Sequence, residues 1–369
     1  MRNLFYEMLS KLKCIITKLL LWLPFSIWII MILTEAILVR IHEFFSLFVS
    51  VIPLLSLFIL IYYLLIVILV RSRRNMILIS LILCTCVIKY SDHWISFKAT
   101  PGKNSVELKV MTWNVQRLGA LSNKQNSANN LKKLVAKLES NSADIVILQE
   151  ISKRQIYQLA NKLNLPSDNI QWTNYYNGAK GGLAILLLNN ASWSLSSKQT
   201  TDLPPSWKCV FAEIEHHSGQ TINLLGVHIA PPKITDDQVK IAAKKLLKGE
   251  GAVLNKILRR YVRQARKQNK QIDKINSMVS RFKDPTIIAG DFNSTCQLPM
   301  HTELRSSLTD TWIEGGNGIG ATRYWADILP FRIDYIYTTD QFKVANTYTG
   351  DTAFSDHNPV ISEIFIEGT

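Results

Sequence analysis

One short segment carries most of the information about the fold: Thr286-Ile287-Ile288-Ala289-Gly290-Asp291-Phe292-Asn293. Its first four residues are apolar or β-branched, which is typical of a buried strand. Asp291 and Asn293 follow almost at once, so they lie at the end of that strand. Open α/β sheets gather their ligand-binding groups at such strand ends. An Asp-x-Asn pair alone is also typical of an ordinary turn, so its meaning depends on similar groups elsewhere.

Polar side chains follow or interrupt other apolar runs as well. The predicted strands run over 106–115, 143–150, 181–187, 209–215, 221–227, 286–289 and 332–337. The pair 209–215 and 221–227 is separated by Ser218-Gly219 and predicts a hairpin. Ser127 is predicted to cap a helix with the apolar face Leu131, Leu134, Val135 and Leu138. The polar side chains at strand ends or within strands are, in chain order, Asn114, Glu150, His228, Asp291, Asn293, Asp334, Asp356 and His357.

These residue types suit phosphoryl chemistry. Carboxylates are hard oxygen ligands for Mg²⁺ and can take a proton from water. An asparagine amide donates hydrogen bonds to a phosphoryl oxygen without adding negative charge, and histidine exchanges protons near neutral pH. The adjacent pair Asp356-His357 needs such a reason, because both side chains are costly to bury without partners. His228 has no evident acidic partner in the sequence.

The order and placement of these groups resemble the endonuclease/exonuclease/phosphatase superfamily, which has the DNase I-like fold. The strongest parts of the resemblance are Gly290-Asp291-Phe292-Asn293 and Ser355-Asp356-His357, and it extends over about 106–365. It implies an α/β protein, a four-layer α/β sandwich of two packed mixed sheets with helices outside. It also implies a hydrolase of phosphoric ester bonds that uses Mg²⁺, with Mn²⁺ as the alternative cation.

The resemblance also implies which residues hold the cation. Asn114 and Glu150 look like the Mg²⁺-binding pair. Asp356 looks like a residue that completes or adjoins the metal site.

Five further residues resemble the family's catalytic groups. Asp291 and Asn293 resemble the residues that orient the attacking water and the phosphoryl group. His357, oriented by Asp334, resembles the catalytic histidine. His228 resembles the histidine that contacts the phosphate or protonates the leaving oxygen. The resemblance leaves open whether Asp291 or His357 takes the proton of the water.

The first quarter of the chain differs in character from the rest. Three apolar segments, about 19–39, 44–70 and 76–90, predict a helical membrane region of about three spans. The first two are long enough to cross a hydrocarbon core of about 30 Å, whereas the third is marginal. We therefore expect a transmembrane anchor over 1–98 and a catalytic domain over 99–369.

Basic residues beside the first two apolar segments predict the orientation. Arg2, Lys11, Lys13 and Lys18 precede the first span, and Arg71, Arg73 and Arg74 follow the second. The positive-inside rule places both groups in the cytoplasm. If 76–90 crosses the membrane the large domain faces outward, and if not it is cytoplasmic. Three crossings are the preferred interpretation.

Positive charge is concentrated in one segment of the large domain. Residues 233–283 contain 15 Lys and Arg against 4 Asp and Glu. Thr235-Asp236-Asp237-Gln238 fits a capping box at a helix start, and a second, long helix is predicted over about 252–280. Its polar side is either an ordinary solvated face or a surface for anionic lipid or a polyanionic substrate. That side carries Arg259, Arg260, Arg263, Arg266, Lys267 and Lys270.

Three functions are weighed against each other. The layout of three apolar segments before this domain looks like a bacterial membrane branch associated with glycopeptide resistance. That likeness implies an inner-membrane enzyme with an extracytoplasmic domain that dephosphorylates a lipid-linked phosphate such as polyprenyl pyrophosphate. Membrane lipids and this substrate are its expected partners, and no obligate protein partner is inferred. The alternatives are a membrane-tethered nuclease and a non-catalytic membrane binding protein.

The five cysteines do not form a disulfide framework. Cys14, Cys84 and Cys86 lie in or beside apolar segments. Cys209 and Cys296 could pair only if folding brought them together.

Overall fold

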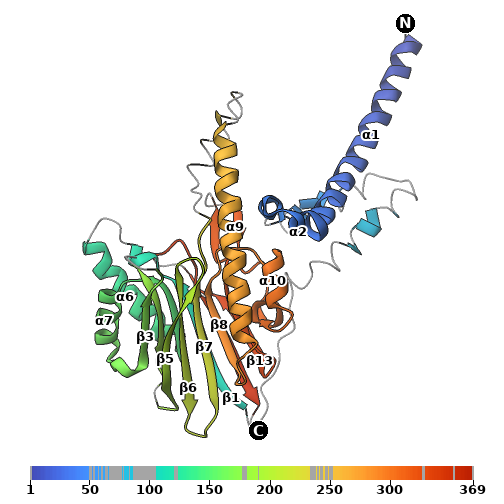
Figure 1. Cartoon of the computed structure of the whole chain (residues 1–369). Helices are drawn as coiled ribbons and strands as arrows, with labels where there is room; N and C mark the ends of the chain where they lie inside the picture. The colour runs from blue at the N-terminus through green and yellow to red at the C-terminus, as the bar shows by residue number, and fades with distance from the viewer. Residues whose placement is uncertain are drawn as a thin grey trace. The chain divides into compact units, whose positions relative to one another are not determined.

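The computed structural model describes residues 2–49, 105–119, 124–176, 181–189, 191–232, 252–325, 329–351 and 354–367, with scattered positions in 52–85 and 238–248. The chain divides into two compact units. The larger one, His93–Cys296 with Met300–Thr369, contains both large β-sheets (Figure 1). The domain boundary predicted at 98 lies outside the described residues.

Two six-stranded mixed sheets form the larger unit. Their strands are β1 (Ser105–Asn114), β2 (Ile145–Ile151), β3 (Ile170–Asn174), β4 (Gly182–Leu187), β5 (Trp193–Leu203), β6 (Trp207–His216), β7 (Thr221–His228), β8 (Thr286–Asp291), β9 (Thr309–Asp310), β12 (Asp334–Thr338), β13 (Phe342–Thr349) and β14 (Val360–Glu367). The first sheet has the order β13-β14-β1-β2-β4-β3, and the second β5-β6-β7-β8-β12-β9. In each sheet one pair is parallel, β1 with β2 and β7 with β8. The separate hairpin is β10 (Arg323–Trp325) with β11 (Leu329–Phe331).

The two sheets pack face to face. Gly226 on β7 is one point of close approach, because a Cβ added there would lie 3.1 Å from Ile147 Cγ2 on β2. The interior strands are continuous apolar runs, as expected of strands covered on both faces. All six residues of β4 and of β8 are buried.

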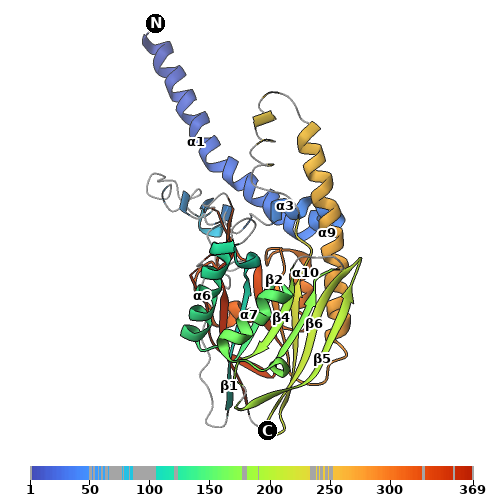
Figure 2. The ribbon, with the colours of Figure 1, turned by 90° about the vertical axis from the view of Figure 1, so that its left-hand side faces the viewer.

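Helices cover the outer faces of the sandwich (Figures 1 and 2). α6 (Lys124–Asn141) and α7 (Lys153–Leu163) lie against the first sheet, where Leu131, Leu134 and Leu138 join one apolar cluster with residues of β1, β2 and β4. α9 (Ala252–Val279) lies along the second sheet. Two short helices are α10 (Pro299–Leu304) and α11 (Thr311–Gly315). The predicted α/β sandwich with two mixed sheets is confirmed.

The predictions for individual helices and hairpins were confirmed in part. The hairpin of β6 and β7 and the long helix α9 are confirmed. The helix expected to be capped by Ser127 instead begins at Lys124, so Ser127 lies in its first turn. The capping box over 235–238 lies outside the described residues except for Gln238. Cys209 and Cys296 are both buried and are not joined in a disulfide.

The amino-terminal residues are helical. α1 (Arg2–Leu33) begins well before the span predicted over 19–39, and a π-helical turn (Thr34–Leu38) and α2 (Val39–Ile41) follow it. A 3₁₀ turn (Glu43–Phe45) and α3 (Ser46–Val49) come next. Among the described residues, no helix combines the length and apolar character needed to cross a bilayer. About half of each of the spans predicted over 44–70 and 76–90 lies outside the described residues.

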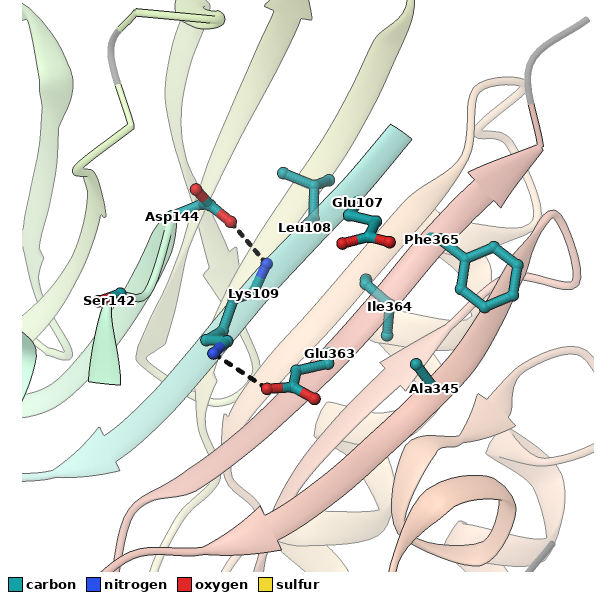
Figure 3. Close-up of a pocket in the computed structure, with 9 residues that line it drawn as sticks. All are labelled: Glu107, Leu108, Lys109, Ser142, Asp144, Ala345, Glu363, Ile364 and Phe365. Atoms are coloured by element: carbon teal, nitrogen blue, oxygen red, sulfur yellow. Dashed lines mark hydrogen bonds and ion pairs between the residues drawn. The ribbon is translucent and has the colours of Figure 1, made fainter. Parts of the chain in front are cut away.

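The sandwich has a hollow of about 380 Å³ near the start of β1 and β2 (Figure 3). Lys109 crosses it, with its backbone N–H donating to Asp144 Oδ2 at 2.7 Å and its Nζ 2.9 Å from Glu363 Oε1. The polar groups singled out in the sequence lie at the opposite end of these strands. The lining residues are Glu107, Leu108, Lys109, Ser142, Asp144, Ala345, Glu363, Ile364 and Phe365.

Candidate active site

The strand directions bring the polar strand ends together. β1 and β2 run in parallel, so Asn114 and Glu150 come to the same edge of the first sheet. β7 and β8 do the same in the second sheet, where His228 is paired with Asp291. β12 runs antiparallel to β8, which sets its first residue, Asp334, opposite Asp291. Both sheets therefore present these groups at one end of the sandwich.

His357 and Asp334 form a buried hydrogen-bonded pair. His357 Nδ1 lies 2.8 Å from Asp334 Oδ2. Burial disfavours charge on the imidazole, but the carboxylates of Asp334 and Asp291 outweigh it and raise the pKa of His357 to about 9. The ring is therefore protonated at neutral pH. Its Nδ1–H donates to Asp334, and its Nε2 lies 3.9 Å from Asp291 Oδ2.

Asp291 is held by two donors. The backbone N–H of Asn293 donates to its Oδ1 at 2.7 Å, and Asn114 Nδ2 donates to its Oδ2 at 3.0 Å. Burial, followed by the charge of Asp334, raises the pKa of Asp291. A carboxylate with a raised pKa is a stronger proton acceptor than an ordinary one.

Asn293 sits in a left-handed backbone conformation with φ of 50°. Its Nδ2 donates to the carbonyl of Ile229 at 2.9 Å, so it links the loop after β8 to the loop after β7. The amide carries a second N–H, which is the group available for a phosphoryl oxygen.

His228 has two acidic neighbours that are remote in the sequence. Its Nε2 lies 4.0 Å from Glu150 Oε1 and 3.6 Å from Asp291 Oδ2, which corrects the expectation that it has no acidic partner. Tyr175 and Trp207 meet its ring edge-on, with centroids 5.2 and 5.6 Å away. These two aromatic rings stack on each other at 5.3 Å. Sequence reasoning missed both, because no spacing connects them with His228.

Asn114 and Glu150, two of the three predicted metal ligands, are adjacent. Asn114 Nδ2 lies 3.4 Å from Glu150 Oε1, and its Oδ1 accepts the backbone N–H of Gln116 at 3.0 Å. Glu150 stands at an irregularity between β2 and β4, with φ of 56° and a partly exposed side chain. The amide nitrogen of Asn114, rather than its oxygen, therefore faces the carboxylates.

Asp356, the third predicted ligand, lies at the rim. Its Oδ2 is 3.0 Å from Arg323 Nη2, and its Oδ1 is 3.9 Å from His357 Nε2. The ligand assignment of all three residues stays a prediction.

Five side-chain atoms form a continuous series across the site, in which each atom is close to the next. Neighbouring atoms are between 3.6 and 4.0 Å apart. Such gaps are too long for direct hydrogen bonds, and polar gaps of this length suit a bridging water, cation or phosphoryl oxygen. In order, the atoms are Glu150 Oε1, His228 Nε2, Asp291 Oδ2, His357 Nε2 and Asp356 Oδ1. The other three predicted residues, Asn114, Asn293 and Asp334, are hydrogen-bonded to members of this series, so all eight lie together.

The donor set suits a divalent cation. Among the described residues, one polar atom each of Asp291, Asp334 and His357 lies within 4.8 Å of the other two. The two carboxylates supply oxygen donors there, whereas the protonated ring of His357 does not bind a cation. Asp334 Oδ1 is buried and has no hydrogen-bond partner in the described part of the chain. Adjacent buried carboxylates repel each other, and a cation nearby would relieve that repulsion. Hard oxygen donors of this kind fit Mg²⁺ or Mn²⁺.

Two buried glutamines of α9, Gln268 and Gln271, hydrogen-bond to the loops that follow β7 and β8. Gln268 Nε2 donates to the carbonyls of Ala230 and Asn293 at 2.9 and 3.1 Å. Gln271 Oε1 accepts the backbone N–H of Ala230 at 2.9 Å. Sequence reasoning missed both glutamines. They lie on the same stripe of the helix as Ile275, and that spacing was the available signal.

Comparisons with known proteins agree with this geometry. The model of the Endonuclease/Exonuclease/phosphatase family matches residues 111–357. Among curated proteins, none matches the chain.

Several solved structures share the fold. An endonuclease/exonuclease/phosphatase from Bacteroides vulgatus aligns with a TM-score of 0.52 and 15% identity, covering 71% of this chain and 100% of that one. One from Beutenbergia cavernae gives 0.51 and 18%, covering 71% and 72%. TDP2 of D. rerio, complexed with single strand DNA product, gives 0.52 and 15%, covering 70% and 98%. The family match covers most of the chain and contains all eight site residues, so the chain belongs to the endonuclease/exonuclease/phosphatase family, whose members are hydrolases acting on phosphoester bonds.

Proposed function

We propose that the chain is a metal-dependent phosphohydrolase that works with Mg²⁺ or Mn²⁺. One observation carries the proposal: the hydrogen-bonded His357–Asp334 pair faces Asp291 at 3.9 Å, within the same site as Glu150. A charged donor and a basic carboxylate side by side are what attack of water on phosphorus requires.

The pKa shifts of His357 and Asp291 assign different roles to these two residues. His357 is protonated at neutral pH, so its Nε2–H donates to an oxygen of the phosphoryl group and stabilises the charge that develops there. Asp291, with its raised pKa, accepts the proton of the attacking water. Asn293 donates its remaining N–H to the phosphoryl group, and His228 contacts the phosphate or the leaving oxygen.

The cation would be held by Glu150 and Asp356 with the side-chain oxygen of Asn114. When bound, it neutralises charge on the phosphoryl oxygens. Asp356 would leave Arg323 to reach it, and the amide of Asn114 would turn its oxygen inward.

The proposed substrate is a lipid-linked phosphate such as polyprenyl pyrophosphate. Support comes from the amino-terminal region, where α1 exposes large apolar side chains that suit an apolar environment. They are Tyr6, Met8, Leu12, Ile15, Ile16, Trp22, Leu23, Ile27, Ile29, Ile30 and Leu33. On this proposal, residues 1–98 anchor the enzyme in the inner membrane through about three spans and the catalytic domain lies outside the cytoplasm. A reporter fused after Thr369 that is active only in the cytoplasm would contradict this topology.

A second candidate is a membrane-tethered nuclease. The basic side of α9 favours it, because Arg259, Arg263, Arg266 and Lys270 are exposed and could follow a phosphate backbone. A third candidate, a non-catalytic membrane binding protein, has no need of the charged His357 beside Asp291.

Detergent-solubilised full-length protein separates these candidates. We expect Mg²⁺-dependent phosphate release from polyprenyl pyrophosphate, abolished in Glu150→Ala and His357→Ala. Cleavage of plasmid DNA that collapses with salt, with no action on the lipid, would favour the nuclease. Phosphate release that is unchanged in both variants would favour the binding protein.

A further inference from the structure

Arg117, just after β1, stands on an unusual turn. Gln116, Arg117 and Leu118 all have left-handed backbone conformations, with φ of 43°, 53° and 59°. None of them is glycine, and this conformation is disfavoured for residues with a Cβ. Such strain persists where surrounding structure enforces it, and it concentrates at functional sites.

The turn is tied down on both sides of Arg117. Gln155 Nε2, from α7, donates to the carbonyl of Arg117 at 2.8 Å. Asn130 Nδ2, from α6, donates to the carbonyl of Leu118 at 2.7 Å, and the Leu118 side chain is completely buried. The backbone that carries the Arg117 side chain is therefore fixed by two helices.

The guanidinium of Arg117 donates only one hydrogen bond among the described residues. Its Nη2 donates to Tyr175 Oη at 3.2 Å. Its Nε is buried and has no hydrogen-bond partner in the described part of the chain. Among the described residues, no carboxylate lies within 4.0 Å of it. An arginine presents five donors in a rigid fork, so most of this capacity is left for something else.

Tyr175 places that guanidinium beside the reaction site. The Tyr175 ring lies edge-on against His228 at 5.2 Å. Glu150 is also among the charges that act on Arg117. The positive group therefore lies one side chain beyond His228, on the Glu150 side of the site.

We propose that Arg117 binds a second, non-reacting phosphate of the substrate, so that the site is selective for diphosphates over monophosphates. This rests on the proposed phosphohydrolase function. The reacting phosphate is already served by His357, Asp291 and Asn293. Arg117, which is connected to His228 through Tyr175, is left for the next phosphate along. Arginine matches phosphate oxygens with two parallel hydrogen bonds. Tyr175 is the positioning residue, since its Oη holds the guanidinium in place.

Two variants of the full-length protein test this proposal, with a matched control. Arg117→Gln removes the charge and keeps the length, and Arg117→Lys keeps the charge without the fork. Arg154→Gln removes an exposed arginine of α7 that has no place in the site. Substrates are the diphosphate and the monophosphate of the same long-chain isoprenyl alcohol.

We expect Arg117→Gln to raise the KM for the diphosphate by at least about tenfold, with kcat/KM for the monophosphate within about twofold of wild type. The KM of Arg117→Lys for the diphosphate should lie between those of wild type and Arg117→Gln. Arg154→Gln should match wild type on both substrates. Equal losses on the two substrates in Arg117→Gln would overturn the proposal. If that variant melts at a lower temperature, Arg117→Gly replaces it, because glycine suits the left-handed turn.

Binding of inorganic pyrophosphate to metal-free protein gives a readout independent of turnover. Calorimetry should show tighter binding of pyrophosphate than of phosphate to wild type, and loss of that preference in Arg117→Gln. An unchanged preference would overturn the proposal. A wild type that prefers pyrophosphate yet hydrolyses neither lipid refutes the proposed function and supports the diphosphate site. A diphosphate taken from free nucleotides in place of lipid would appear as hydrolysis of a nucleoside diphosphate at a lower KM.

Discussion

Two buried histidines of this protein, His357 and His301, show opposite protonation. His357 faces the active site and lies against Asp334 and Asp291, and its pKa is raised to about 9. His301, on α10, lies behind the loop after β8 and hydrogen-bonds to two hydroxyls, with Ser294 Oγ and Tyr337 Oη each 2.8 Å from its ring nitrogens. Burial, aided by the charge of Arg305, lowers the pKa of His301 to about 3.

The comparison shows that the partners, rather than burial, set the charge of a histidine. Burial alone favours the neutral ring in both places. Neutral hydroxyls do not offset the desolvation cost of a charged ring at His301, whereas two carboxylates offset it at His357. One histidine is therefore a charged catalytic group and the other a neutral part of the aromatic cluster with Tyr335 and Phe292.

The largest expected effect separates the two histidines by activity. His357→Ala should lower kcat by about 10²–10⁴-fold, because it removes the charged donor at the phosphoryl group. His301→Gln should keep kcat within about tenfold, since it changes no group that touches substrate. Steady-state kinetics on folded, Mg²⁺-loaded protein measures both. Equal losses would mean that the neutral cluster acts in catalysis and would break the comparison.

A smaller effect tests the cause of the charge on His357. Asp334→Asn keeps the shape of the side chain and removes its charge, so burial should then bring the pKa of His357 down from about 9 towards or below its ordinary value. NMR titration of the imidazole measures this directly. We expect kcat near pH 8 to fall by about tenfold to a hundredfold as the ring loses its proton. A pKa that stays near 9 would assign the shift to Asp291 alone.

The smallest effect concerns stability and pH. Because the folded pKa of His301 is lowered, its contribution to stability is present above about pH 6.5 and is lost as the pH falls towards 3. The loss between pH 6.5 and 5 is about 1.5 kcal/mol, and His301→Gln should remove it in denaturant unfolding. His357 acts in the opposite sense: its contribution is present below about pH 6.5 and is lost as the pH rises through about 9. An acid limb unchanged in His301→Gln would contradict the neutral assignment.

Much of the fold and the site could be predicted because the signals are local. Apolar runs that end on Asn114, Glu150, His228 and Asp291 mark strands by the character of neighbouring residues. Ends of parallel strands meet at one edge, so placing these residues together required only the strand directions. The start of α6 was misjudged, since Ser127 is as compatible with a first helical turn as with a cap.

Partners across the fold were beyond the reach of the sequence. Glu150 approaches His228 only because two different sheets pack face to face. Arg117 meets Tyr175 through a left-handed turn that no sequence pattern marks. The buried glutamines of α9 lie on its inward stripe, but no sequence pattern shows that they hydrogen-bond to the loops after β7 and β8.

The sequence by itself predicted the class of fold through its periodicity and the family through its strand-end motifs, because both signals are encoded by neighbours along the chain. It also singled out eight residues that the structure brings together. Only the tertiary structure decided which residues pair and which histidine carries a charge. Hydrogen bonding and Coulomb interactions depend on distances across the fold, and those distances join residues that lie far apart in the sequence.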